Sequence, residues 1–307
     1  MRRLLNKRIL KNLKQVLLNR FYVLHSNTFG LEVNNKPLDL ANPLVMGVIN
    51  LSSESATSAG RFPDNFLAVE HALQLVEEGA DILDIGAEAT NPKVYQFSNT
   101  EQQLEKLIPF LKSIRQKIQI PISIDTSSPE VMQVVADLGA DMINDVRALQ
   151  MPGALEMAAK LNLPICLMHM RYPFGQSAAK ELPAFNSVIN EIKQFFVDRL
   201  KRCEQVGIAR EKIILDPGVG HGNFGKNTTE NLAIIRDLKQ IKDFNLPILI
   251  GVSRKTFIGE LLNQTPDERL FGSLACALIA VQNGANIVRV HDVKATKDVL
   301  KMLCAVE

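Results

Sequence analysis

Short apolar runs that each end in a polar residue recur through the chain and alternate with helical patterns. The runs predict strands over residues 44–49, 81–83, 120–124, 141–143, 165–168, 212–215, 248–252 and 286–290. Helical patterns fall between and after them, over residues 65–78, 100–117, 129–138, 153–161, 185–206, 228–241, 267–283 and 294–303. Strands of a parallel sheet are covered on both faces and read as continuous apolar runs, so eight alternating units predict a (β/α)8 TIM barrel. An open doubly wound sheet competes, although no Gly-x-Gly-x-x-Gly fingerprint follows the first run.

A small repeat supports this alternation. The tripeptide Gly-Ala-Asp, or Gly-Ala-Asn, precedes three of the predicted strands, at residues 79–81, 139–141 and 284–286. Each glycine suits the left-handed conformation in which helices commonly end. The repeat therefore marks three junctions between a helix and the next strand.

The first 27 residues differ from the rest and form a predicted basic extension, followed by a barrel domain over residues 28–307. Arg2, Arg3, Lys7, Arg8, Lys11, Lys14 and Arg20 precede the first acidic residue, and leucines recur at three- and four-residue spacing. This pattern predicts an amphipathic helix. No uninterrupted apolar core follows the basic start, which argues against a secretory signal. A helix docked on the body, a surface or membrane-contact helix and a disordered extension remain open.

The bulk composition is that of an ordinary soluble enzyme. The formal net charge is +2 in 307 residues, so no general attraction to nucleic acid is expected. The four cysteines, Cys166, Cys203, Cys276 and Cys304, are widely spaced and fit small buried residues in a reducing compartment. No apolar run approaches the ~18–20 residues that a membrane span needs. We therefore expect a cytoplasmic protein.

Acceptor groups stand at the ends of four predicted strands. Asp84, Asp125, Asn144 and Asp216 come from different strands, and in a (β/α)8 barrel such ends converge on one site. A carboxylate accepts two parallel N–H bonds, so the set suits a ligand with a guanidine-like edge, such as a pterin or guanine ring. A metal cluster is the other use of converging carboxylates. Any one aspartate could instead cap the following helix, as Asp125 could before residues 126–128.

Positive charge follows in the last two strands. Lys255 comes after the seventh strand, and Arg289 and His291 alternate at the end of the eighth, so they face the same side. Phosphate groups commonly bind in this corner of the fold, and Asn50 of the first strand lies next to it. Thr256 is predicted to open a helix whose free N–H groups suit a carboxylate. His169 ends the fifth strand, where a hydrogen-bonded histidine of the barrel wall is favoured over a catalytic one.

Eight motifs in this order resemble those of dihydropteroate synthases, in the pterin-binding barrel superfamily, from about residue 29 onward. They are MGVIN at 46–50, DIG at 84–86, SIDT at 123–126, IND at 143–145, LMHM at 167–170, LDPG at 215–218, GVSRK at 251–255 and RVHDV at 289–293. That family joins 6-hydroxymethyl-7,8-dihydropterin diphosphate to 4-aminobenzoate, which gives 7,8-dihydropteroate for folate synthesis and releases diphosphate. The resemblance implies the same reaction, with Mg²⁺ as cofactor and a homodimer as the expected assembly.

The resemblance also implies roles for single residues. It assigns Asp84, Asp125, Asn144, Asp216 and Lys255 to the pterin, and Asp84, Asp125 and Lys255 to catalysis. It assigns Asn50, Arg289 and His291 to the diphosphate, with Mg²⁺ at Asn50. The 4-aminobenzoate would then contact Thr90, Pro92, Ser253 and Thr256.

Two loops depart from the family pattern. After the first strand, Glu54, Ala56 and Ser58 stand where the family usually has aspartate, phenylalanine and aspartate, and after the second Asn91 replaces an arginine. The loop after Asp216 is longer and has His221 where an aromatic residue is common. A degenerate, non-catalytic pterin-binding paralogue is therefore one alternative. A methyltransferase-type pterin barrel is another, although Arg289 and His291 argue against it.

Overall fold

Eight parallel strands form the wall of a nearly closed barrel. The computed structural model describes residues 31–33, 36–51, 64–88, 99–173 and 187–306. Hydrogen bonds connect the strands in the order β8-β7-β6-β5-β4-β3-β10-β9, and a single bridge between Leu215 and Ile248 joins β8 to β9. The strands are β3 (Leu44–Asn50), β4 (Ile82–Gly86), β5 (Ile122–Asp125), β6 (Met142–Asp145), β7 (Ile165–Met168), β8 (Ile213–Asp216), β9 (Leu249–Gly251) and β10 (Ile287–Val290). The predicted TIM barrel is confirmed.

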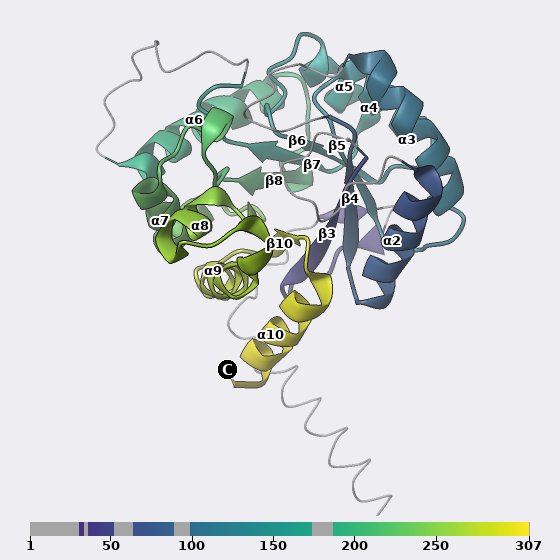
Figure 1. Ribbon diagram of the computed structural model, residues 1–307. Helices are drawn as coiled ribbons and strands as arrows, with labels where there is room; N and C mark the ends of the chain where they lie inside the picture. The colour runs from purple at the N-terminus through teal and green to yellow at the C-terminus, as the bar shows by residue number, and fades with distance from the viewer. Residues whose placement is uncertain (1–30, 34–35, 52–63, 89–98, 174–186, 307) are drawn as a thin grey trace, which may run out of the picture.

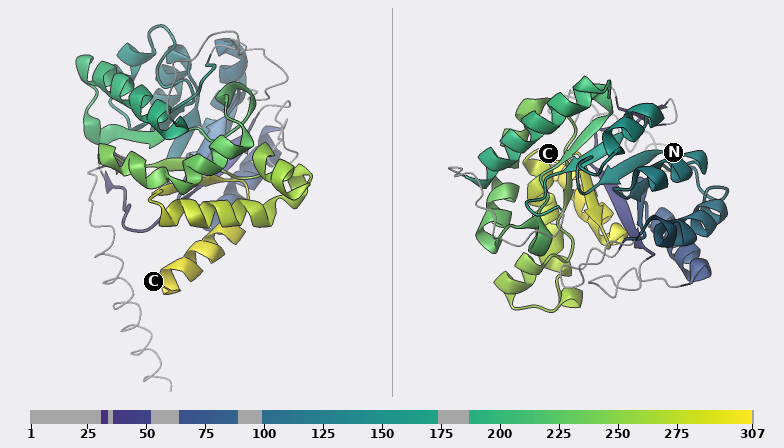
Figure 2. Two further views of the ribbon diagram at one scale, coloured as in Figure 1. Left: turned by 90° about the vertical axis from the view of Figure 1, so that its left-hand side faces the viewer. Right: turned by 90° about the horizontal axis from the view of Figure 1, so that it is seen from above.

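Helices surround this wall, as Figure 1 and the view from above in Figure 2 show. The large apolar core lies between the strands and the helices, where Val45 and Ile49 of β3 meet Leu75 of α2 and Val293 of α10. The helices are α2 (Asn65–Glu77), α3 (Thr100–Ile114), α4 (Pro129–Asp137), α5 (Ala154–Leu161), α6 (Val188–Gln205), α7 (Thr228–Arg236), α8 (Thr256–Leu262), α9 (Leu270–Gln282) and α10 (Val293–Val306).

A second, smaller apolar cluster fills the part of the barrel interior near the N-terminal ends of the strands, here called the lower half. The upper half is the part near their C-terminal ends. One side chain from most strands contributes to it: Met46, Ile82, Met142, Cys166, Ile214, Leu249 and Ile287. Leu31 and Leu40 complete the cluster from the chain around the antiparallel pair β1 (Glu32–Val33) and β2 (Lys36–Pro37). The segment that precedes the barrel thus closes its lower end.

The Gly-Ala-Asp repeat has a structural role that the sequence alone did not reveal. The side chains of Asp81, Asp141 and Asn286 each accept a hydrogen bond from the backbone N–H group of an earlier residue, at 2.7 Å from Val45, 2.7 Å from Ile122 and 3.0 Å from Ile248. Each of these N–H groups lies within one residue of the start of the neighbouring strand. The repeat therefore fixes the register of three strand pairs at the lower end of the barrel.

Several predicted boundaries were wrong. The helix predicted over 228–241 ends at Arg236 and continues as a 3-10 segment, Leu238–Phe244. Asn283 donates a side-chain hydrogen bond to the carbonyl of Ile235 at 2.9 Å, which caps the end of α7. The helix predicted from residue 267 starts at Leu270, after a 3-10 turn at Pro266–Glu268. Asp84 lies in the middle of β4 rather than at its end, because β4 extends to Gly86.

The proposed extension over residues 1–27 lies outside the described residues, so the division at residue 28 stays a prediction. None of the helices that the structure describes has the length and apolar character needed to cross a membrane.

Candidate active site

Asp84 is the centre of a polar cluster in the upper half of the barrel. It is fully buried. Its Oδ1 accepts a hydrogen bond from the hydroxyl of Ser123 at 2.6 Å, and its Oδ2 accepts from Asn144 Nδ2 at 3.1 Å and Arg289 Nε at 2.6 Å. The carboxylate therefore collects donors from β5, β6 and β10, which satisfies a charge that burial would otherwise make costly.

Arg289 links Asp84 to a second carboxylate. Its Nη2 donates to Asp125 Oδ2 at 3.1 Å. Burial opposes the charge of Arg289, but the neighbouring carboxylates of Asp84 and Asp125 outweigh it and hold the arginine pKa above its usual value. Burial raises the pKa of Asp125 to about 7, against the effect of Arg289 and together with that of Asp84. Asp125 does not cap the next helix, because Ser128 accepts the N–H bond of Val131 there.

Asp216 brings a third carboxylate to the interior from β8. It alternates with Ile214, a member of the interior apolar cluster, so it faces the same side. Its Oδ1 accepts the backbone N–H of Gly218 at 2.8 Å. Burial raises the pKa of Asp216, while this hydrogen bond and the charges of Lys255 and Lys226 oppose the shift. Asp84, Asp125, Asn144 and Asp216 therefore converge as the sequence predicted.

Lys255 faces this cluster from the loop between β9 and α8. Its ammonium lies 4.2 Å from the centroid of the Phe224 ring, within range of a cation–π interaction. Burial and the charge of Arg289 lower its pKa to about 8, although Asp216 and Asp125 favour its charged form. Lys255 and Asp216 interact through their charges rather than through a direct ion pair.

His291 and Ser253 form a pair next to the carboxylates. Ser253 Oγ lies 3.0 Å from His291 Nδ1 and accepts the backbone N–H of His291 at 3.3 Å. Burial and the charge of Arg289 lower the pKa of His291 to about 4, so the ring is neutral near pH 7. Asn50, at the end of β3, is half-buried. It stands opposite Gly86 of β4 in the strand register, and Gly86 stands opposite Asp125 of β5.

The remaining predicted residues are placed less closely. Thr256 is exposed in the first turn of α8, for which Lys255 is the N-cap. Thr90, Pro92 and Asn91 lie outside the described residues, as do Glu54, Ala56 and Ser58. His169 belongs to the barrel wall: its ring packs edge-on against Phe195 of α6 at 4.9 Å between centroids, and burial with the charge of Lys226 lowers its pKa to about 3.

Sequence reasoning missed four contacts of this region. Ser123 was detectable, because it stands two residues before Asp125 on the same strand and so shares its face. Phe224 lies within the glycine-rich loop after β8 and Lys226 follows that loop, and neither residue carries a spacing signal. Arg147 donates to both carboxylate oxygens of Glu88, at 2.9 and 2.7 Å, and to the carbonyl of Pro173 at 3.0 Å. It thereby ties together the loops after β4, β6 and β7.

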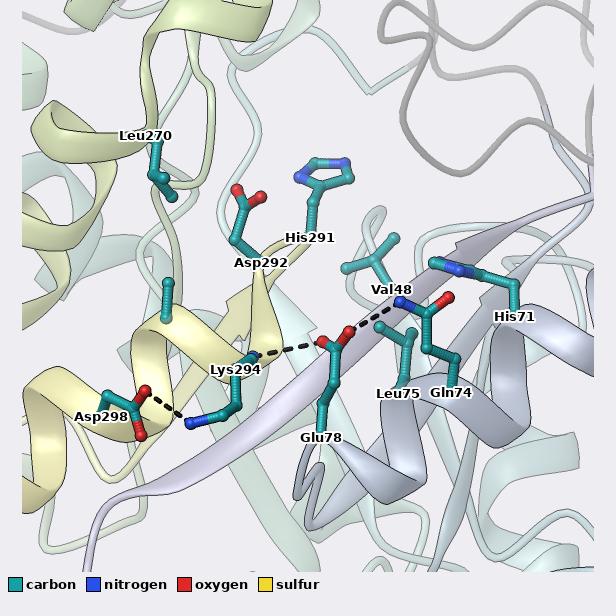
Figure 3. A pocket seen from close by; sticks show the side chains of 11 residues that line it. Val48, His71, Gln74, Leu75, Glu78, Leu270, His291, Asp292, Lys294 and Asp298 are labelled. Atoms are coloured by element: carbon teal, nitrogen blue, oxygen red, sulfur yellow. Dashed lines mark hydrogen bonds and ion pairs between the residues drawn. The ribbon is translucent and has the colours of Figure 1, made fainter.

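A cleft of about 480 Å³ lies on the outer side of the wall, between α2 and α10. Figure 3 shows His291 and Asp292 at one end of it and Glu78, Lys294 and Asp298 at the other. Lys294 pairs with Asp298 at 2.6 Å, and its backbone N–H donates to Glu78 at 3.3 Å. Lys294 and Asp298 thus neutralise each other, whereas Glu78 accepts hydrogen bonds from Gln74 and from the Lys294 backbone.

The described residues contain no group of three or more histidine, cysteine, aspartate or glutamate side chains arranged to hold a metal ion. The oxygen of the Asn50 side chain is a suitable single ligand for Mg²⁺, an ion that keeps several waters and is commonly completed by substrate phosphates. The donor set thus fits Mg²⁺ only as an ion that a phosphate ligand helps to bind. A purely protein-bound cluster, the other use of converging carboxylates, is not supported in this part of the chain.

Known proteins are similar to this chain in both sequence and architecture. Residues 46–291 match a family described as pterin binding enzyme. The dihydropteroate synthase of Escherichia coli (strain K12) is 45% identical over 266 residues, which cover 87% of this chain and 92% of that protein. The dihydropteroate synthase of Haemophilus influenzae is 41% identical over 273 residues, covering 89% and 97%.

Solved structures agree. A dihydropteroate synthase from Coxiella burnetii in complex with pteroic acid has a TM-score of 0.81 and 40% identity, and the alignment covers 90% of this chain and 99% of that one. The enzyme of Xanthomonas albilineans with 4-aminobenzoic acid has a TM-score of 0.80 and 39% identity, covering 90% and 97%. On the matched sequence, the shared barrel and the carboxylate cluster at its upper end, this chain belongs to the dihydropteroate synthase family of pterin-binding enzymes.

Proposed function

We propose that this chain is a dihydropteroate synthase that condenses 6-hydroxymethyl-7,8-dihydropterin diphosphate with 4-aminobenzoate. The observation that carries the proposal is the convergence of Asp84, Asp125, Asn144 and Asp216 with Lys255 in the upper barrel. Pteroic acid, which is bound in the related Coxiella burnetii structure, joins a pterin to an aminobenzoate. The family membership gives no support to the non-catalytic or methyltransferase alternatives.

The pterin-binding role falls to the carboxylate cluster. Asp125, Asp216 and Asn144 offer acceptors for the N–H groups of the ring, and Lys255 offers a donor for a ring oxygen or nitrogen. Asp84 holds Asn144 and Arg289 in place through the contacts described above. Because these groups are ordered by one another, little reorganisation is required when the ring enters.

The chemical step is a displacement at the pterin methylene carbon. The amine nitrogen of 4-aminobenzoate forms the new C–N bond, the C–O bond to the diphosphate breaks with its electron pair, and the amine loses a proton to solvent or to the released diphosphate. Asp84 and Asp125 stabilise positive charge that develops on the pterin methylene. Lys255 contributes by donating a hydrogen bond that holds the ring in place.

The diphosphate is assigned to Asn50, Arg289 and His291. Arg289 contacts Asp84 and Asp125, so binding an anion requires it to share or exchange these partners. Mg²⁺ held by Asn50 and the diphosphate would supply positive charge that stabilises the departing diphosphate. Ser253 and Thr256, with Thr90 and Pro92, are assigned to 4-aminobenzoate; its carboxylate would suit the positive end of α8, which begins at Thr256.

The direct test is diphosphate release by the purified chain with the pterin diphosphate, 4-aminobenzoate and Mg²⁺. We expect release that depends on all three additions, stops with a chelator and resumes with Mg²⁺. Absence of dihydropteroate at high enzyme concentration would overturn the proposal. Asn91→Arg restores the family residue in the divergent loop, and a large gain in rate would identify that position as limiting.

The assembly and location are proposed as a homodimer in the cytoplasm. An exposed groove between α9 and α10 is lined by apolar side chains that include Leu278, Met302 and Val306. Met302 and Val306 are 63% and 80% exposed and line the same groove, and contiguous exposed apolar side chains of this kind can mark an interaction surface. We expect Met302→Glu combined with Val306→Glu to convert a dimer to a monomer in analytical ultracentrifugation. Exposed Lys301→Glu on the same helix is the matched control.

A further inference from the structure

Lys226 is a buried lysine outside the set of residues assigned above. It is only 2% exposed and follows the glycine-rich loop after β8. Its ammonium donates three hydrogen bonds, to the carbonyls of Gly218 at 2.8 Å, His169 at 2.9 Å and Pro217 at 3.3 Å. One side chain thus joins the end of β7 to the turn that follows β8.

The charge of Lys226 has no direct ion pair among the described residues. The nearby carboxylates of Glu191 and Glu230 both pair with Arg171, at 2.6 Å each. Burial lowers the pKa of Lys226 to about 7, against the favourable fields of Glu191, Asp216 and Glu230. Burying an ammonium group with carbonyl partners alone costs free energy. A neutral side chain would fill the same space at a lower free-energy cost, so packing alone does not explain a lysine at this position.

Two of the carbonyls that Lys226 holds, those of Pro217 and Gly218, belong to the turn that orients Asp216. The N–H of Gly218 donates to Asp216 Oδ1 at 2.8 Å, and the N–H of His169 donates to the backbone carbonyl of Asp216 at 2.9 Å. Gly218 has a φ of +70°, and a Cβ there would lie 1.9 Å from the carbonyl oxygen of His169. The turn is therefore pressed against the end of β7, where carbonyl oxygens would repel one another without the ammonium between them.

We propose that Lys226 is a positioning residue for pterin recognition, which acts by holding the Pro217–Gly218 turn so that the Gly218 amide fixes the Asp216 carboxylate. In its protonated form Lys226 also favours the anionic, accepting form of Asp216. The inference rests on the proposed function, because it assumes that Asp216 receives the pterin. Lys226 itself touches no reacting atom.

The test compares Lys226→Met, which keeps the length and removes the charge, with Lys212→Met. Lys212 also donates to a backbone carbonyl, that of Asn162, but at the opposite end of β8. We expect Lys226→Met to weaken binding of 6-hydroxymethylpterin at least tenfold in calorimetry and to raise the KM for the pterin diphosphate. The KM for 4-aminobenzoate should stay within twofold, a split that a general loss of structure would not produce. Lys212→Met should change none of these values.

A spectroscopic signature reads the turn directly. The sequence contains two Pro-Gly pairs, Pro152-Gly153 and Pro217-Gly218, so labelling proline with ¹³C at the carbonyl and glycine with ¹⁵N gives two amide signals. In the wild type, pterin should shift the Gly218 signal and leave that of Gly153 in place. This measurement needs no variant, so the inference stays testable if Lys226→Met does not fold.

The outcomes separate the two proposals. A wild type that binds no pterin overturns the proposed function. A wild type that binds pterin without any response at Gly218, or a folded Lys226→Met that binds pterin as tightly as wild type, overturns the positioning role alone. Weakened pterin binding with an unchanged KM for 4-aminobenzoate supports it.

Discussion

The two halves of the barrel interior use the same strands for opposite purposes. In the lower half, Ile82, Met142, Ile214 and Ile287 pack into an apolar cluster. Two residues further along each strand, the same face carries Asp84, Asn144, Asp216 and Arg289, a distance of roughly 6–7 Å. The lower layer is stabilised by burial of apolar surface, whereas every charge in the upper layer must be offset by another charge or donor. A shift of two residues along each strand thus separates the apolar layer that stabilises the fold from the polar layer that forms the candidate active site.

The sharpest way to break this comparison is Asp84→Asn. An amide cannot accept from Arg289 and Asn144 as a carboxylate does, so we expect turnover to fall by about 10³-fold and stability by about 3–5 kcal/mol. Steady-state kinetics and urea unfolding measure the two effects. Asp81→Ala is the control just before the same strand, because Asp81 accepts the backbone N–H of Val45 at the lower end; it should lose stability only. Near-normal turnover in Asp84→Asn would contradict the division.

Ile214→Ala tests the lower layer in the same strand as Asp216. Removing a fully buried side chain should lower the free energy of unfolding by about 2–5 kcal/mol. Turnover per folded molecule should remain within about twofold, since the apolar cluster contacts no reacting group in the proposed mechanism. If kcat fell as much as in Asp84→Asn, the two layers would not be separable.

Lys255→Met should separate activity from stability in the opposite direction. The folded pKa of Lys255, about 8, lies below the ordinary value of 10.5, so the unfolded chain binds this proton more tightly. The penalty of holding the charge is present below pH 8 and disappears as pH rises toward 10.5. The variant should therefore be more stable than wild type at pH 7, by on the order of 1 kcal/mol, and equally stable near pH 10.5, while turnover is lost. Thermal unfolding across this range measures it, and a less stable variant at pH 7 would refute the assignment.

Thr256→Val is expected to have the smallest effect. Thr256 is exposed, so stability should change by no more than about 0.5 kcal/mol. If its hydroxyl contacts 4-aminobenzoate, the KM for that substrate should rise about threefold, as loss of one exposed hydrogen bond predicts. The KM for the pterin diphosphate serves as the internal control. An unchanged pair of KM values would remove Thr256 from the site.

The alternation of strands and helices was predictable because strands buried on both faces leave continuous apolar runs in the sequence. The cluster around Asp84 was predictable for a related reason: a carboxylate that ends or interrupts such a run needs partners. The two-residue strands β1 and β2 were not, since they are too short to show any periodicity. Nor was the break after Arg236, which depends on Asn283, a residue 48 positions from its partner Ile235.

The limits of prediction at the site follow the same principle. Ser123 shares a strand with Asp125, so local spacing contains its position. Lys226 makes contacts with His169 across 57 positions of sequence, and no local pattern records them. Family resemblance could assign Arg289 to an anion, but only the folded chain shows it between Asp84 and Asp125. Contacts between distant loops are thus the part of the site that sequence reasoning reaches last.

The single bridge between β8 and β9 suggests where the chain could be circularly permuted. Every other neighbouring pair in the barrel shares a ladder of at least three paired residues, while these two strands meet only at Leu215 and Ile248. A circular permutant with new ends in the connection at Asn245, between Phe244 and β9, would interrupt the least inter-strand pairing. Asp216 precedes the new ends in the present sequence, and Lys255 follows them. Such a permutant would therefore keep Asp216 on one continuous segment and Lys255 on the other.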